Sequence, residues 1–225
     1  MQGAAFFDLD RTLIARSSSL ALAGPFRERG LIGRRQLLKA RFAQLVFARF
    51  GAGHGRAGQT ADAGMSILRG LPVELLQEIV EQAWKPVLRP LVYREALDAA
   101  QTHEARGEPV YIVSGALQEV VDRLAAELGF AGALGSRAEV EDGLYTGRLA
   151  RRLLGAEKAV GLGELADAGS IDLGGSTAYS DSHADLAFLE SVGTPVAVNP
   201  DRELRRIAES RGWAVRRFSH LLGSG

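Results

Sequence analysis

Two aspartates that lie one residue apart, Asp8 and Asp10, are the first residues of the chain that could do chemistry. Carboxylates held close together have separated pKa values, so one stays ionised while the other can carry a proton. Such a pair could supply a nucleophile or metal ligand together with a general acid or base. For an isolated Asp-x-Asp pattern, two solvated loop carboxylates are the simpler interpretation, so the assignment depends on residues elsewhere in the chain.

Two later segments share the design around Asp8, a short apolar run that ends in a polar residue. Residues 110–113 lead into Ser114, and residues 176–180 lead into Asp181. Taken singly, Ser114 would be a helix N-cap and Asp181 a turn residue. Their similar position at the ends of apolar runs favours a common site.

Lys158 and Asp185 are two further candidates for that site. The chain has 27 lysine and arginine residues, and only Lys39, Lys85 and Lys158 among them are lysines. Lys39 and Lys85 match no motif, and we expect both to be solvated. Taken singly, Lys158 would be a surface lysine and Asp185 an acidic residue at the start of a helix.

The elements that must position these residues follow from the spacing of apolar side chains. We expect strands at residues 4–8, 108–114, 176–181 and 195–198, and helices at residues 117–128, 186–191 and 202–211. Asp201 is expected to cap the last helix, and Gly212 to end it. Alternating strands and helices predict an α/β fold with a parallel sheet covered on both faces. In such sheets the functional residues lie at the carboxyl ends of the strands.

A block of helical pattern interrupts this alternation between residues 17 and 89. Helices are expected at residues 18–29, 34–50, 60–69 and 73–84, and glycine-rich breaks separate them. We therefore expect residues 1–16 and 90–225 to form the core, with residues 17–89 inserted as a helical bundle after the first strand. A smaller insertion is expected at residues 138–149, where Asp142 and Gly143 mark a hairpin turn.

The composition excludes several classes of protein. The chain of 225 residues has no cysteine, which rules out a disulfide framework, a zinc–thiolate site and a thiol nucleophile. Its formal net charge is zero, so nucleic acid is not expected as a partner. No secretory signal and no apolar stretch long enough to span a bilayer is apparent. We expect a cytoplasmic protein without a membrane partner; the oligomeric state is left open.

The polar residues occur in the order of four motifs, and here the chain resembles the haloacid dehalogenase (HAD) superfamily of phosphatases. The first motif, Asp-x-Asp-x-Thr-Leu, is matched by residues 8–13. The second is a strand that ends in serine or threonine, matched at Ser114. Lys158 matches the third, and Asp181 with Asp185 matches the fourth.

The resemblance implies a Rossmann-like HAD core. Residues 17–89 look like the helical cap of that superfamily, and the hairpin at residues 143–147 is similar to the branch that contains phosphoserine phosphatase.

The resemblance also implies a role for each residue. Asp8 would attack phosphorus and form an aspartyl-phosphate, and Asp10 would protonate the leaving alcohol and then activate water. Mg²⁺ would bind the Asp8 side chain, the Asp10 backbone carbonyl and Asp181, with Asp185 as a supporting or water-mediated ligand. The phosphate oxygens would be held by Ser114, Gly115 and Lys158, with Thr12 buttressing the loop.

The expected substrate is a small-molecule phosphomonoester of open identity. Phosphoserine phosphatases read the substrate's amino group with a glutamate near the start of the cap, whereas this chain has Ser17 and no nearby acid. The fourth motif also departs from the family, with Ser180 and Ala184 in place of the usual glycine and asparagine. A histidinol-phosphate-like or polyol phosphate fits no worse than phosphoserine. His183, inside the fourth motif, has either a ligand contact or no role.

Two other classes of function share part of this pattern. A receiver-type signalling domain also uses strand-end carboxylates, a serine or threonine and a lysine around Mg²⁺. Against it stand the second aspartate two residues after the first and the large helical insertion. An inactive HAD-fold binding module is the other alternative, and the complete set of catalytic residues opposes it.

Overall fold

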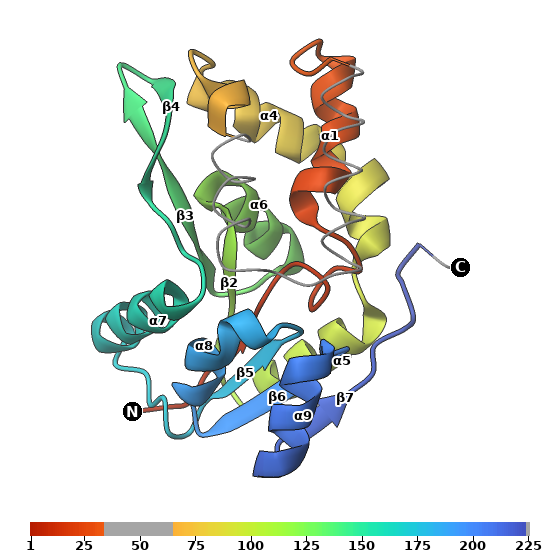
Figure 1. Ribbon diagram of the computed structural model, residues 1–225, viewed down its shortest axis with the longest axis vertical. Helices are drawn as coiled ribbons and strands as arrows, with labels where there is room; N and C mark the ends of the chain where they lie inside the picture. The colour runs from red at the N-terminus through yellow and green to blue at the C-terminus, as the bar shows by residue number, and fades with distance from the viewer. Residues whose placement is uncertain (34–64, 224–225) are drawn as a thin grey trace.

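The computed structural model describes residues 1–33 and 65–223, and in this part the chain forms a seven-stranded sheet in the order β4-β3-β2-β1-β5-β6-β7 (Figure 1). The strands are β1 (Ala5–Phe7), β2 (Val110–Leu117), β3 (Gly132–Glu141), β4 (Leu144–Arg151), β5 (Thr177–Ser180), β6 (Thr194–Val198) and β7 (Ala214–Arg216). All neighbouring strands are parallel except β3 and β4, which pair antiparallel. The expected α/β fold with a mostly parallel sheet is confirmed.

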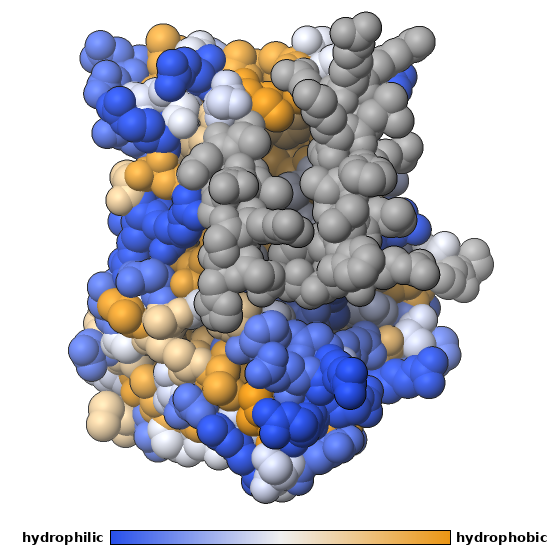
Figure 2. All heavy atoms as spheres, viewed as in Figure 1, coloured by the Kyte–Doolittle hydropathy of each residue, from blue (hydrophilic) through white to orange (hydrophobic). Residues whose placement is uncertain are grey.

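Helices cover both faces of this sheet. Successive side chains of its central strand point to opposite faces, and because they are apolar, both faces must be shielded from water. Ala5 and Phe7 belong to a buried cluster with α5 (Arg94–Glu104) and α6 (Gln118–Leu128). Ala4 and Phe6 belong to a second cluster, which they share with α7 (Ala156–Gly169), α8 (Leu186–Glu190) and α9 (Arg202–Arg211). Figure 2 shows hydrophilic residues gathered where α9 lies.

Residues 17–89, which we call the insert, lie between β1 and β2 and contribute two helices of 11 residues to the described part of the chain. Helices α1 (Ser18–Glu28) and α4 (Val73–Ala83) lie in contact with each other above the sheet (Figure 1). A π-helical turn, η1 (Trp84–Leu88), and a 3₁₀ turn, η2 (Arg89–Leu91), lead back to the core. The expected helices at 18–29 and 73–84 are confirmed to within one residue. The expected helix at 34–50, residues 60–64 of the one at 60–69, and Lys39 lie outside the described residues, while residues 65–68 are helical as expected.

The hairpin that was expected as a small insertion at residues 138–149 is instead part of the sheet. Strand β3 begins six residues earlier than expected and pairs with β2 along its first half. The glycines of this half conceal the strand, since glycine is unfavourable in strands. Gly135 is needed there because a Cβ would lie 2.8 Å from the Cα of Gln118. The expected turn is confirmed, with φ of 49° at Asp142 and 78° at Gly143.

One strand boundary differs from expectation, and some elements were not expected. Strand β2 continues through Ser114 to Leu117, with a register shift against β3 between Val113 and Leu117, so it does not end at Ser114. Ser114 has the residue type of a helix N-cap, but its position lies inside an irregular strand end. Helix α5 and the exposed edge strand β7 have no counterpart among the expected elements. Helix α9 has the expected limits, with Asp201 as its N-cap and Gly212 at its end.

In the described ranges, 1–33 and 65–223, no helix is both long and apolar enough to cross a bilayer.

The C-terminal tail is bound to the core through Glu95, near the start of α5. The Glu95 carboxylate accepts hydrogen bonds from the backbone nitrogens of Ser219, at 2.8 Å, and His220, at 3.1 Å, and contacts Nδ1 of His220 at 2.7 Å. Burial acts to raise the pKa of Glu95, but these donors outweigh it and lower the pKa to about 2. The tail is therefore held by an ionised carboxylate at neutral pH.

We predict that Glu95→Gln lowers the free energy of unfolding by about 1 kcal/mol at pH 7, a value reduced for the partial exposure of the site. Because the folded-state pKa is depressed, this stabilisation is present above the unfolded pKa of about 4.3 and is lost as the pH falls toward 2. Thermal melts of both proteins between pH 7 and 2 should therefore keep most of their difference down to about pH 4 and converge as the pH approaches 2. Glu104→Gln, an exposed acid on the same helix, is the control. A gap that is constant with pH would contradict the prediction.

Candidate active site

A buried ammonium group lies between two buried carboxylates at the end of the central strands. Nζ of Lys158 donates to Oδ1 of Asp8 at 2.6 Å and to Oδ2 of Asp185 at 2.7 Å. Relative exposures are 3% for Lys158, 5% for Asp8 and 6% for Asp185. Three of the predicted site residues, which are far apart in the sequence, therefore form one ion cluster.

The fold fixes each member of this cluster through the backbone. Asp8 directly follows β1, and its backbone nitrogen donates to the carbonyl of Tyr179 on β5 at 2.9 Å. Asp185 ends a 3₁₀ turn after β5, η3 (His183–Asp185), and Lys158 lies in the first turn of α7. Gly155 precedes that turn with φ of 58° and ψ of −125°, a backbone conformation that glycine adopts most readily. Lys39 and Lys85 were predicted to be solvated; Lys85 is exposed, as expected, whereas Lys158 is buried.

The electrostatics of the cluster follow from its burial. Burial raises the pKa of Asp8 to about 7, with Lys158 acting against the rise and Asp185 adding to it. Burial also raises the pKa of Asp181 to about 8, and the nearby Asp8 adds to the rise. For Lys158, burial favours the neutral amine, but Asp185 and Asp8 outweigh it and raise the pKa above its usual range. Lys158 is thus a permanent cation among carboxylates that repel one another.

Asp10 turns its side chain toward the start of α1. Its Oδ1 accepts a hydrogen bond from the backbone nitrogen of Ser18 at 2.8 Å. Burial raises the pKa of Asp10, and the bonds from Ser18 and Ser17 act against the rise. The next residue, Arg11, has a φ of 64° in the left-handed region, and its Nη1 lies 3.8 Å from Oδ2 of Asp181. The turn after β1 therefore gives the two aspartates different surroundings, as an acid–base division of labour requires.

Ser114 and Gly115 follow Ile112, which pairs with Phe7 of β1, so they lie at the same edge of the sheet as Asp8. Ser114 is buried, and its Oγ accepts from the backbone nitrogen of Ala116 at 3.2 Å. A Cβ at Gly115 would lie 2.3 Å from Cδ2 of Leu154, so any other residue there would displace that exposed side chain. Thr12 is fully buried, and within the described residues its Oγ1 has no hydrogen-bond partner.

The donor set near Asp8 fits a magnesium ion. Mg²⁺ takes oxygen ligands and keeps several waters, and it is commonly bound through one or two carboxylates. Asp8 raises the pKa of Asp181, and a bound divalent cation would offset that repulsion. Within residues 1–33 and 65–223 no three histidine, aspartate or glutamate side chains are arranged as a metal cage. The expected set has the Asp8 and Asp181 side chains and the Asp10 carbonyl as direct ligands, with Asp185 as a supporting or water-mediated ligand.

Some residues near the site were not predicted from the sequence to take part in it. Ser180, noted only as a departure from the family's glycine, donates from Oγ to Oδ2 of Asp185 at 2.7 Å. Arg11 lies beside Asp181, and Asp201 bonds the loop that carries the fourth motif. The replacement of a usual glycine was the one signal in the sequence that could have pointed to Ser180.

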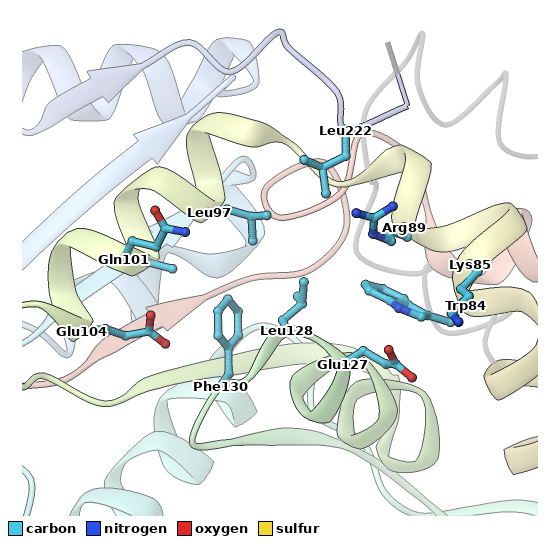
Figure 3. A pocket seen from close by; sticks show the side chains of 11 residues that line it. Trp84, Lys85, Arg89, Leu97, Gln101, Glu104, Glu127, Leu128, Phe130 and Leu222 are labelled. Atoms are coloured by element: carbon cyan, nitrogen blue, oxygen red, sulfur yellow. The ribbon is translucent and has the colours of Figure 1, made fainter. Parts of the chain in front are cut away.

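A cavity of about 520 Å³ lies elsewhere, between α5, α6 and η1 (Figure 3). Its lining combines apolar side chains such as Trp84, Leu97 and Leu128 with Glu104 and Glu127. The residues predicted for catalysis, phosphate or metal do not line it. The candidate site is therefore identified by its charged groups and not by the volume of this cavity.

A mostly parallel α/β sheet brings two aspartates bridged by a lysine to the ends of its central strands, where the functional residues of such sheets lie. The model of the haloacid dehalogenase-like hydrolase family matches residues 5–190, and the chain belongs to this family.

Relatives and solved structures agree with that membership. A probable phosphatase of Mycobacterium tuberculosis is 42% identical over 216 residues, which cover 96% of this chain and 75% of the relative. A phosphoserine phosphatase of the same organism is 33% identical over 222 residues, covering 97% and 71%. The crystal structure of a Bordetella pertussis protein of unknown function has a TM-score of 0.82 at 28% identity, covering 96% of this chain and 98% of that one. The chain is accordingly a phosphatase of the haloacid dehalogenase-like family.

We predict that Lys158→Met, measured with EDTA present, lowers the free energy of unfolding by about 3 kcal/mol at pH 8, because two buried carboxylates lose their counter-charge. Without Lys158 the folded-state pKa of Asp8 rises further above 7, so the penalty grows with increasing pH. Chemical denaturation at pH 5.5 and 8 measures the change, with the exposed Lys85→Met as the matched control. An equal loss at both values would show that the charge of Lys158 is not what stabilises the cluster.

Proposed function

We propose that the chain is a Mg²⁺-dependent phosphomonoesterase that works through an aspartyl-phosphate on Asp8. The observation that carries the proposal is the bridge from Lys158 to Asp8 and Asp185 at 2.6 and 2.7 Å. A cation at this distance favours the ionised form of Asp8 against the effect of burial, and only the ionised carboxylate can act as a nucleophile.

In the first step an Oδ atom of Asp8 attacks phosphorus, and the bond from phosphorus to the ester oxygen breaks. Asp10 gives its proton to the leaving alkoxide, which departs as the alcohol. In the second step Asp10 takes a proton from water, the water oxygen attacks phosphorus, and the bond to Asp8 breaks. The raised pKa of Asp10 suits a group that must hold a proton before the first step.

The remaining polar residues would stabilise charge. Lys158, Ser114 and the backbone nitrogen of Gly115 would hold the phosphoryl oxygens. Mg²⁺, held by Asp8, Asp181 and the Asp10 carbonyl, would offset the repulsion between the nucleophile and the anionic phosphate. Asp185 would support the site from behind, since its Oδ2 is already bonded to Lys158 and Ser180.

We further propose that the insert, residues 17–89, is a cap over a core of residues 1–16 and 90–225. Two observations support this division. The insert leaves the sheet at the end of β1, where Asp8 lies, and its first helix donates a backbone hydrogen bond to Asp10 through Ser18. The substrate would then be bound between the catalytic aspartates and the insert.

The substrate class that fits best is a small-molecule phosphomonoester. Asp10 faces Ser17 and Ser18, and the sequence has no acid there to bind an amino group. Phosphoserine nevertheless belongs in the test, because a relative that is 33% identical is named a phosphoserine phosphatase. A panel with phosphoserine, histidinol phosphate and polyol phosphates in the presence of Mg²⁺ would rank these candidates.

We predict that Asp8→Asn lowers kcat for p-nitrophenyl phosphate at least about 10³-fold while the melting temperature stays within a few degrees of the wild type. The amide keeps the shape of the side chain but cannot attack phosphorus. The exposed Asp98→Asn, on α5, should retain full activity. Undiminished turnover by Asp8→Asn would refute the mechanism, and a stable phosphorylated wild type without phosphate release would favour a receiver-type domain.

A further inference from the structure

Asp201 connects the N-terminus of α9 to the loop of residues 181–185, which we call the Asp181 loop. Its Oδ1 accepts from the backbone nitrogen of Leu204 at 2.8 Å, which caps α9. Its Oδ2 accepts from the backbone nitrogen of His183 at 2.9 Å and lies 2.9 Å from Nδ1 of the same residue. One carboxylate therefore serves a helix end and a loop at the same time.

The contact between the two segments extends beyond these bonds. The backbone nitrogen of Asp201 donates to the carbonyl of Asp181 at 2.8 Å. Oγ of Ser182 lies 3.4 Å from Oδ2 of Asp201. Asp201 thus contacts three consecutive residues of the Asp181 loop, from Asp181 to His183.

The two ends of this loop carry charged groups of the proposed site. Asp181 begins the loop and is one of the carboxylates whose pKa is raised by burial and by Asp8. Asp185 ends it and accepts from Lys158, which in turn donates to Asp8. A shift of the loop would therefore move a proposed metal ligand and the anchor of Lys158 together.

The charge of Asp201 suits this task. Burial acts to raise its pKa, but the donors from Leu204 and His183 outweigh burial and lower the pKa. The carboxylate also lies at the N-terminus of α9, where the helix dipole favours negative charge. Both carboxylate oxygens of Asp201 accept hydrogen bonds, Oδ1 from α9 and Oδ2 from the Asp181 loop. An asparagine side chain has one accepting oxygen, so it could accept on only one of these two sides.

We propose that Asp201 is a positioning residue that sets the affinity of the site for Mg²⁺ by holding the Asp181 loop. The proposal rests on the proposed function in one respect, the assignment of Asp181 as a metal ligand. Asp201 touches neither the substrate nor the metal in this scheme, and it acts through the backbone of Asp181 and His183.

The test is Asp201→Asn in the full chain. Asparagine is as good an N-cap as aspartate, so its Oδ1 can keep the bond to Leu204, while its Nδ2 cannot accept from His183. Removal of a residue that holds a metal ligand in place typically lowers metal affinity 10–100-fold. We expect isothermal titration of the apo-protein with MgCl₂ to show affinity weakened at least about 10-fold. Turnover should fall at low Mg²⁺ and recover in excess Mg²⁺.

Glu95→Gln is the matched control, because Glu95 also accepts from two backbone nitrogens and contacts the Nδ1 of a histidine, but in the C-terminal tail. This variant should lose a similar amount of thermal stability and keep the Mg²⁺ affinity of the wild type. If Asp201→Asn is not recovered folded, Asp201→Ser, which also caps helices, takes its place.

Equal Mg²⁺ affinity of the wild type and the Asp201 variant overturns the proposal, as does a weakened affinity in Glu95→Gln of the same size. Excess Mg²⁺ that fails to restore turnover also counts against it, because a positioning defect in the metal site is relieved by mass action. A wild type that binds Mg²⁺ but hydrolyses no ester would sink the proposed function, while a loss of binding in the variant would still support the role of Asp201.

Discussion

The ion cluster of Lys158, Asp8 and Asp185 is the constraint on which the rest of the structure depends. An ammonium group that is 3% exposed costs several kcal/mol to desolvate, so it is tolerated only where its partners are held in place. The partners come from the end of β1 and the loop after β5, and Lys158 comes from the first turn of α7. The cluster can therefore form only when the strands are paired correctly and α7 is packed in its place against the sheet.

Apolar packing on the two faces of the sheet holds these elements in place. Phe7 stacks on Tyr179 of the neighbouring strand with ring centroids 4.2 Å apart, on the face covered by α5 and α6. Phe6 stacks on Tyr111 at 5.7 Å on the opposite face, which α7, α8 and α9 cover. Asp8 directly follows Phe7, so the packing of these aromatic residues fixes the position of the Asp8 carboxylate at the end of β1.

The sequence predicted most of this arrangement where local pattern and chemistry coincide. The parallel sheet and the position of Asp8 follow from apolar runs that end in polar residues, and the limits of α9 follow from Asp201 and Gly212. Lys158 and Asp185 were expected beside Asp8 because of the resemblance to the HAD superfamily. The pairing of β3 with the sheet was missed because it depends on glycines that a neighbouring helix requires, and a contact of that kind leaves no periodic signal. Ser180 acts through a hydrogen bond to Asp185, and residue type alone does not indicate such a bond.

The central claim is that Asp8 carries the phosphoryl group during turnover. The most direct measurement is rapid acid quench during turnover of a good substrate, reduction with sodium borohydride and mass spectrometry of the N-terminal peptide. Borohydride converts an aspartyl-phosphate into homoserine, so the account predicts homoserine at position 8 in the wild type and none in a sample without substrate. Homoserine at another aspartate, or none at any position while phosphate is being released, would contradict it.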